Sequence, residues 1–247
     1  MEPIEPSAHD RRLEQIYAAL HGVLDPELDQ SVVELGFMSD VCVVDDTATV
    51  TFRLPTFWCS ANFAWIMAED MRLALGAVSG LRRAEIRLVD HFASDKINQG
   101  IAGGLSFRET FLGEAEGDLA GLRATFRRKA FLGRMSALIE ALRDLGWSDE
   151  RIATARIGDL AGIAEETSAR PLVDRYLELR AYFGGPCQPG DAAFRTAEGE
   201  TLMAARLTAY LRDIRMTRRG VEANGEMCRI LLAERYQGSG RRDHAEA

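Results

Sequence analysis

The chain has 247 residues, of which 47% are apolar, and its formal net charge is −8. This length is enough for one large domain or two small ones, each with a buried core. No apolar run approaches the roughly 18–20 residues of a membrane-spanning helix. The acidic start of the chain also lacks the apolar stretch of a signal peptide. We therefore expect no membrane partner.

The charge is distributed unevenly along the chain. Residues 1–95 carry 16 acidic and seven basic side chains, whereas residues 96–247 carry 22 acidic and 23 basic ones. The acidic first part disfavours nucleic-acid binding there, because phosphates require basic side chains. The arginines of the second part are expected to pair with acidic residues, and no recognition motif accompanies them. We therefore expect no nucleic-acid partner.

The cysteines suggest the compartment in which the protein works. There are four, at positions 42, 59, 187 and 228, and no two of them form a Cys-x-x-Cys motif. This spacing excludes a zinc ribbon and a thioredoxin-type site. Four scattered cysteines in a chain of this length are also unlike a secreted disulfide framework. The sequence therefore predicts a cytoplasmic protein with reduced thiols.

Residues 1–95 predict a small α/β domain. Apolar residues at helical spacing alternate with short β-rich runs, and Asp45-Asp46 separates the first two strands as a tight turn. In chain order we expect a helix over 10–23, strands over 37–44 and 47–54, a helix over 60–78 and a strand over 81–89. The order is α-β-β-α-β, which predicts a three-stranded sheet with packed helices.

Residues 96–236 predict an all-helical domain, since strand signals stop near residue 95. The expected helices lie within 95–113 and over 118–145, 171–183, 198–217 and 221–236. Residues 237–247, rich in Gly and charged residues, are expected to be a disordered tail. The predicted fold class is therefore α+β, a small mixed domain followed by a helical one.

The turn after the second strand carries the most informative residue, Cys59. It directly precedes a predicted helix, where the helix dipole and unpaired N–H groups favour a thiolate. The alternative is a small buried apolar residue. Thr56, three positions earlier, could hydrogen-bond a sulfur or a bound ion, or could be an ordinary β-region threonine. Cys59 is therefore a candidate metal ligand or nucleophile.

Two carboxylates lie in the turn after the first helix. Asp25 and Glu27 belong to the segment Asp25-Pro26-Glu27-Leu28. They could face the thiolate of Cys59 and orient or balance a bound metal there. The alternative is an acidic turn in which Asp25 caps the local backbone.

Together these segments resemble a known family. The combination of Asp25-Pro26-Glu27-Leu28, Ser31-Val32-Val33-Glu34-Leu35-Gly36-Phe37 and the turn Pro55-Thr56-Phe57-Trp58-Cys59-Ser60 is similar to the iron–sulfur assembly family of SufT-like and PaaD-like proteins. The resemblance covers residues 10–92. It implies that Asp25 matches the family's acidic residue and Cys59 its functional cysteine. Ser60 stands where that family usually has a proline.

The resemblance also implies a function and partners. Such proteins take part in iron–sulfur cluster assembly or metalloenzyme maturation, mostly as adaptors rather than enzymes. Iron or an iron–sulfur cluster would bind transiently. The helical extension would recognise a client metalloenzyme, and similar extended bacterial proteins suggest a di-iron monooxygenase. A cluster could also be shared across a homodimer.

Further candidate ligands lie outside the matched motifs. Cys187 lies in a Gly/Pro loop and Cys228 lies in a predicted helix, and either would add a thiolate if the fold brought it beside Cys59. His91 follows the third strand and is a candidate base or a structural residue. No nucleotide-binding glycine motif and no nucleophile elbow occurs.

Three functions remain in competition at this point. The first is the assembly factor with Cys59 as a transient ligand and no catalytic turnover. The second is a thiol-dependent enzyme in which Cys59 is the nucleophile and Asp25 or His91 its partner. The third is an adaptor without a metal, in which Cys59 is buried and inert.

Overall fold

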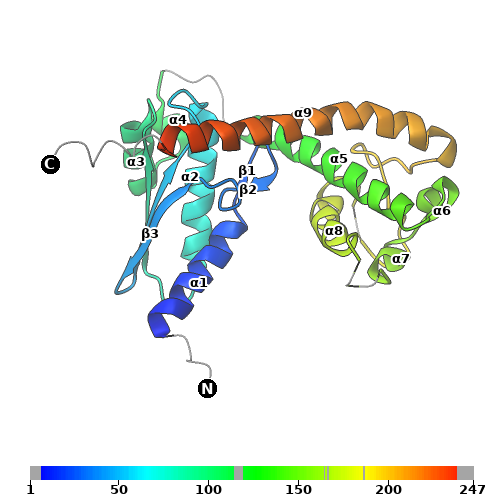
Figure 1. Cartoon of the computed structure of the whole chain (residues 1–247), viewed down its shortest axis with the longest axis horizontal. Helices are drawn as coiled ribbons and strands as arrows, with labels where there is room; N and C mark the ends of the chain where they lie inside the picture. Colours follow the sequence, from blue (N-terminus) through cyan, green and yellow to red (C-terminus); the bar gives the residue numbers. More distant parts are fainter. Residues whose placement is uncertain (1–6, 114–118, 164, 166, 186, 238–247) are drawn as a thin grey trace. The chain divides into compact units, whose positions relative to one another are not determined.

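The computed structural model describes residues 7–113, 119–163, 165, 167–185 and 187–237 (Figure 1). The chain divides into two compact units, one formed by residues 1–122 and 223–247 and the other by residues 123–222. The first unit is a mixed α/β structure and the second is mostly helical, so the predicted α+β class is confirmed. Within the described residues, no helix is both long and apolar enough to cross a lipid bilayer.

A three-stranded sheet is the centre of the first unit. Strands β3 (Met38–Val44), β4 (Thr47–Arg53) and β5 (Arg83–Val89) lie in that order, with β3 antiparallel and β5 parallel to β4. Alternate residues of β4 are buried, as the predicted strand pattern requires. Helix α2 (Ala61–Gly76) makes the crossover between the parallel strands.

Helices around the sheet complete the first core. Helix α1 (Ala8–His21) begins with a Ser7–Asp10 capping box, and α3 (Ser94–Ala102) and α4 (Phe107–Thr110) follow β5. The core joins apolar side chains of α1, α2, the sheet, α3 and α4: Ile16, Leu20, Val50, Phe52, Trp65, Met71, Leu88, Ile97, Ile101 and Phe107. The described residues 96–113 and 119–122 also belong to the first unit.

A two-strand hairpin follows α1. Strands β1 (Leu24–Asp25) and β2 (Gln30–Ser31) pair antiparallel, with Asp25 opposite Gln30. The sequence predicted a turn after the first helix but no pair of strands there. Four residues fold this turn back on itself, and Asp29 adopts a positive φ of 52°, a conformation that Asp tolerates better than most residues. The hairpin fixes Asp25 beside the first core.

The second unit has its own core. It contains most of α5 (Ala120–Asp144), then α6 (Asp149–Thr154), α7 (Ile157–Ala161), α8 (Arg170–Gly184) and the first half of α9 (Ala204–Gln237). Its interior is built from aromatic and aliphatic side chains, among them Phe131, Met135, Leu138, Tyr176, Phe194 and Leu207. The predicted helices over 118–145 and 171–183 correspond to α5 and α8.

Helix α9 corrects one prediction. The sequence predicted separate helices over 198–217 and 221–236, whereas α9 is a single helix of 34 residues. Gly220 and Gly225 lie inside it. Glycine costs about 1 kcal/mol relative to alanine in a helix, but it does not remove a hydrogen bond as proline does. Residues 223–237 belong to the first unit, and the predicted tail from 238 onward lies outside the described residues.

Candidate functional site

The turn between β4 and α2 presents Cys59. Its backbone N–H donates to the Thr56 carbonyl at 3.4 Å, which closes the turn, and Ser60 is the N-cap residue of α2. The Thr56 Oγ1 lies 3.3 Å from the Cys59 Sγ. Cys59 is half-buried and packs against the first core. The thiol therefore sits at the edge of the core with a hydroxyl partner.

His91 holds the backbone of that turn. Its Nδ1 accepts a hydrogen bond from the Ala93 N–H at 3.2 Å, so the neutral ring carries its proton on Nε2, which donates to the Cys59 carbonyl at 2.8 Å. Burial is the largest cause that lowers the pKa of His91 below its ordinary value of 6.5. Both ring nitrogens are engaged by backbone groups, so the geometry favours a structural role over that of a base for the thiol.

Asp25 is a buried carboxyl with local partners. It is 7% exposed, and its Oδ1 accepts hydrogen bonds from the N–H groups of Glu27 and Leu28, both at 2.9 Å. Desolvation raises the pKa of Asp25 from 3.8 to about 6, against the opposing effect of the two backbone bonds. Asp25 thus caps the turn, and it does so at an electrostatic cost that a surface capping residue would not have.

Cys228 lies in the part of α9 that packs against the first core. Burial raises the pKa of the Cys228 thiol to about 11, and the charges of Asp25, Cys59 and Glu27 act on it in the same direction. Both cysteines pack against the same core. We call Asp25, Glu27, Cys59 and Cys228 the thiol–carboxylate cluster. The sequence motifs point to the first three of these residues. Cys228 lies 169 residues after Cys59 in the chain, and no local pattern indicates that α9 packs here.

The cluster is not a closed metal cage. Among the residues that the structure describes, no three His, Cys, Asp or Glu side chains converge as a metal site. Cys187 belongs to the second unit, where its Sγ lies 3.8 Å from the Gly185 carbonyl. Its predicted role as a ligand stays a prediction.

Exposed aromatic rings lie at the turn that carries Cys59. Trp58 is 77% exposed and stacks on Phe92 at 5.8 Å between ring centroids, while Phe57 meets Trp58 edge-on at 4.9 Å. The Phe92 N–H donates to the Phe57 carbonyl at 3.1 Å, which links the two turns. An exposed group of large apolar side chains is typical of an interaction surface.

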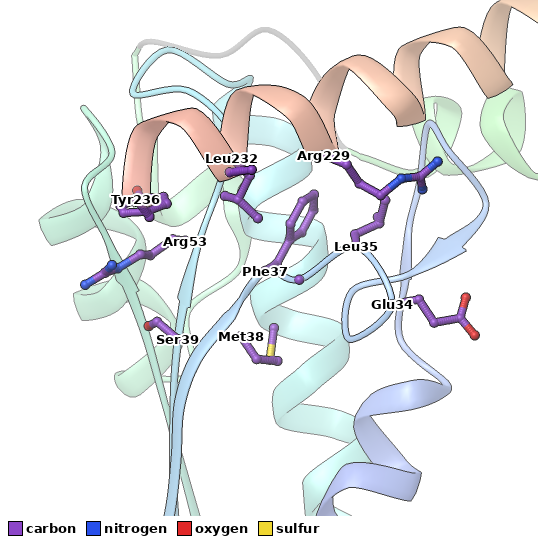
Figure 2. A pocket seen from close by; sticks show the side chains of 11 residues that line it. Glu34, Leu35, Phe37, Met38, Ser39, Arg53, Arg229, Leu232 and Tyr236 are labelled. Carbon is purple, nitrogen blue, oxygen red and sulfur yellow. The ribbon is translucent and has the colours of Figure 1, made fainter. Parts of the chain in front are cut away.

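A separate groove lies between the loop before β3 and the end of α9. Its volume is about 550 Å³. Figure 2 shows Leu232 and Tyr236 of α9 above Phe37, with Arg53 beneath the Tyr236 ring. The Arg53 guanidinium lies 4.5 Å from the centroid of that ring. The groove is lined by none of the cluster residues, so it marks where α9 packs rather than where the thiols lie.

Comparison with known proteins bears on the first unit. The profile described as "Iron-sulfur cluster assembly protein" matches residues 13–88. The uncharacterized protein MJ1129 of Methanocaldococcus jannaschii is 33% identical over 88 residues, which cover 35% of this chain and 90% of that protein. The matched residues include the hairpin with Asp25, the three-stranded sheet and the Cys59 turn. Through this part of its first unit, the chain belongs to the family of iron–sulfur cluster assembly proteins.

Proposed function

We propose that this protein is an adaptor or carrier that matures metalloenzymes, and that it binds iron or an iron–sulfur cluster transiently through Cys59. The observation that carries the proposal is a half-buried thiol beside the Thr56 hydroxyl, within a domain of the assembly family. Thiolates are the usual ligands of iron–sulfur clusters. A partly open site suits a protein that must release its cargo.

The neighbouring groups have supporting roles in this proposal. The Thr56 hydroxyl can donate a hydrogen bond to a metal-bound Cys59 sulfur, and such bonds tune metal sites. Asp25 and Glu27 would offset the positive charge of the cargo. His91 orients the turn through the Cys59 carbonyl. No catalytic turnover is part of the proposal.

The partners are also proposed. The second unit lies outside the family match and has a core of its own, which suits a module that recognises a client. We propose a metalloenzyme as the client, with a di-iron monooxygenase as the first to test, and a homodimer as the form that could share a cluster. The four cysteines are free, which suits the reducing cytoplasm.

Anaerobic reconstitution with iron and sulfide tests the role of Cys59. We expect the wild-type chain to retain iron after desalting, measured as iron and sulfide per chain and as visible absorbance, and Cys59→Ser to retain little. Cys42→Ser is the matched control, because Cys42 is an exposed cysteine of β3 in the same unit. Equal iron content in wild type and Cys59→Ser would overturn the proposal.

A second experiment tests the carrier function. The iron-loaded chain is mixed with a purified, iron-free di-iron monooxygenase, and the iron in each protein is measured after separation. In the presence of a chelator, we expect the oxygenase to gain iron faster from the iron-loaded chain than from free ferrous iron. Transfer at the same rate from both sources would argue against a carrier with this client.

A further inference from the structure

The last turns of α9 pack onto the hairpin that carries Asp25. The Arg229 Nη1 donates to the Gln30 Oε1 at 2.8 Å. Gly225 faces the same side chain so closely that a Cβ there would lie 3.0 Å from the Gln30 Nε2. Gln30 is the strand partner of Asp25. The turn of α9 from 225 to 229 therefore lies against the hairpin.

A second clamp holds the end of α9. The Arg235 guanidinium donates to the Asp90 carbonyl at 2.7 Å and to the Leu54 carbonyl at 3.2 Å. These carbonyls follow the ends of β5 and β4, where the chain continues into His91 and toward Cys59. Leu232, between the clamps, is buried in the first core. The helix is thus fixed at both ends of this segment.

Cys228 lies between the two clamps on the inner face of α9. It follows Gly225 by three residues and precedes Leu232 by four, and residues at these spacings share one helix face. Its side chain is half-buried against the core that Cys59 also contacts. The Arg235 clamp holds this part of α9 against the Leu54 carbonyl, five residues before Cys59 at the start of the turn that carries it. Two thiols from distant parts of the chain therefore share one neighbourhood.

We propose that Cys228 is a second protein ligand to the metal that Cys59 binds, so that α9 and the assembly domain share a two-thiolate site for a soft cargo metal such as Fe(II). This inference rests on the proposed role of Cys59. Thiolates favour such metals, and both thiols lose their protons to the solvent on binding. With two protein ligands, the remaining positions of the metal stay open to sulfide or to a ligand of the client.

Anaerobic titration with Co(II) tests the shared site. Cobalt substitutes for iron, and its near-ultraviolet thiolate charge-transfer band grows with the number of bound thiolates. We expect the absorbance per bound cobalt to fall to about half in Cys59→Ser and in Cys228→Ser, and to vanish in the double variant. The exposed Cys42 of β3 gives the matched control, Cys42→Ser, which should keep the full band.

The outcomes separate the two proposals. A Cys228→Ser band equal to that of wild type overturns the shared site, while a loss in Cys59→Ser still supports the role of Cys59. Full bands in both single variants, or a wild-type chain that binds no cobalt through thiolate, overturn both the shared site and the role of Cys59.

Alkylation of the wild-type chain, followed by mass spectrometry, tests the shared site without any substitution. Bound cobalt should slow the reaction at Cys59 and Cys228 but not at Cys42, and an unchanged rate at Cys228 overturns the shared site.

Discussion

At the scale of single residues, Asp25 shows a conflict between stability and a proposed function. Its carboxyl is buried, and burial raises its pKa from 3.8 to about 6. The folded chain therefore favours the protonated form of Asp25. Asp25 lowers the stability of the fold as the pH rises from 3.8, the pKa of the carboxyl in the unfolded chain, through about 6, its pKa in the folded chain. Because one pKa unit corresponds to about 1.4 kcal/mol, the cost above pH 7 approaches about 3 kcal/mol.

Asp25→Asn should therefore stabilise the protein at neutral pH. The amide oxygen can still accept the hydrogen bonds from the Glu27 and Leu28 N–H groups, while the buried charge is gone. We expect the free energy of unfolding in urea to rise by about 1–3 kcal/mol at pH 8, and the gain to disappear below pH 4. Glu27→Gln, at a half-buried position, is the control and should change little. Equal effects of Asp25→Asn at both pH values would contradict the electrostatic origin.

His91 should give stability the opposite pH dependence. Its pKa is lowered in the folded chain, chiefly by burial, so the unfolded chain takes up the proton first. Stability is present above pH 6.5 and is lost as the pH falls through the folded pKa. His91→Gln, which can still donate to the Cys59 carbonyl, should flatten the dependence of the unfolding free energy on pH below 6.5. An unchanged slope would show that another group titrates there.

At the scale of elements, the contact of α3 with α2 and α4 depends on Gly100. A Cβ at this position would lie 2.3 Å from the Thr110 Oγ1 and 2.7 Å from the Trp65 Cζ3. Trp65 is fully buried and packs edge-on against Phe107 and Phe111. The ring cannot yield without disturbing these aromatic contacts, so any side chain at 100 must separate the helices.

Gly100→Ala is therefore expected to destabilise the first unit. Overpacking of a well-filled core costs about 1–3 kcal/mol, and we expect a loss of that size in urea unfolding followed by tryptophan fluorescence. Gly76→Ala is the matched control, because nothing lies within 4 Å of a Cβ at the end of α2. It should be neutral or slightly stabilising. Equal effects of the two substitutions would show that the α2–α3–α4 contact is looser than described.

Local patterns predicted most of the elements but not their long-range contacts. The alternation in β4 and the helical spacing of α5 are properties of neighbouring residues, and both elements appear where expected. The continuity of α9 could not be inferred, because two glycines weaken a helix without showing whether packing restores it. Likewise, Asp25 and Cys59 stand out in their motifs. The approach of Cys228 and the bond from His91 to the Cys59 carbonyl depend on how distant segments fold together.

At the scale of the whole molecule, the chain has two cores and one helix that contributes to both. Leu207, Leu211 and Ile214 of α9 belong to the second core, whereas Leu232 belongs to the first. Each core is a continuous group of buried apolar side chains, and cooperative unfolding follows such groups. The two units should therefore unfold separately. The stability against unfolding should change within α9, from that of the second unit to that of the first.

Hydrogen exchange measured by mass spectrometry can locate that change. Phe131→Ala removes a fully buried ring from the second core and should cost about 3–5 kcal/mol. We expect faster exchange over α6, α8 and the first half of α9, while β4, β5 and the last turns of α9 keep their protection. Val50→Ala, a fully buried position of β4, should give the reverse pattern. If either substitution accelerates exchange throughout the chain, the two cores unfold as one cooperative structure. If exchange in the last turns of α9 is accelerated by Val50→Ala alone, the segment that carries Cys228 unfolds together with the assembly domain. A metal site with one ligand from α9 and one from the assembly domain requires this.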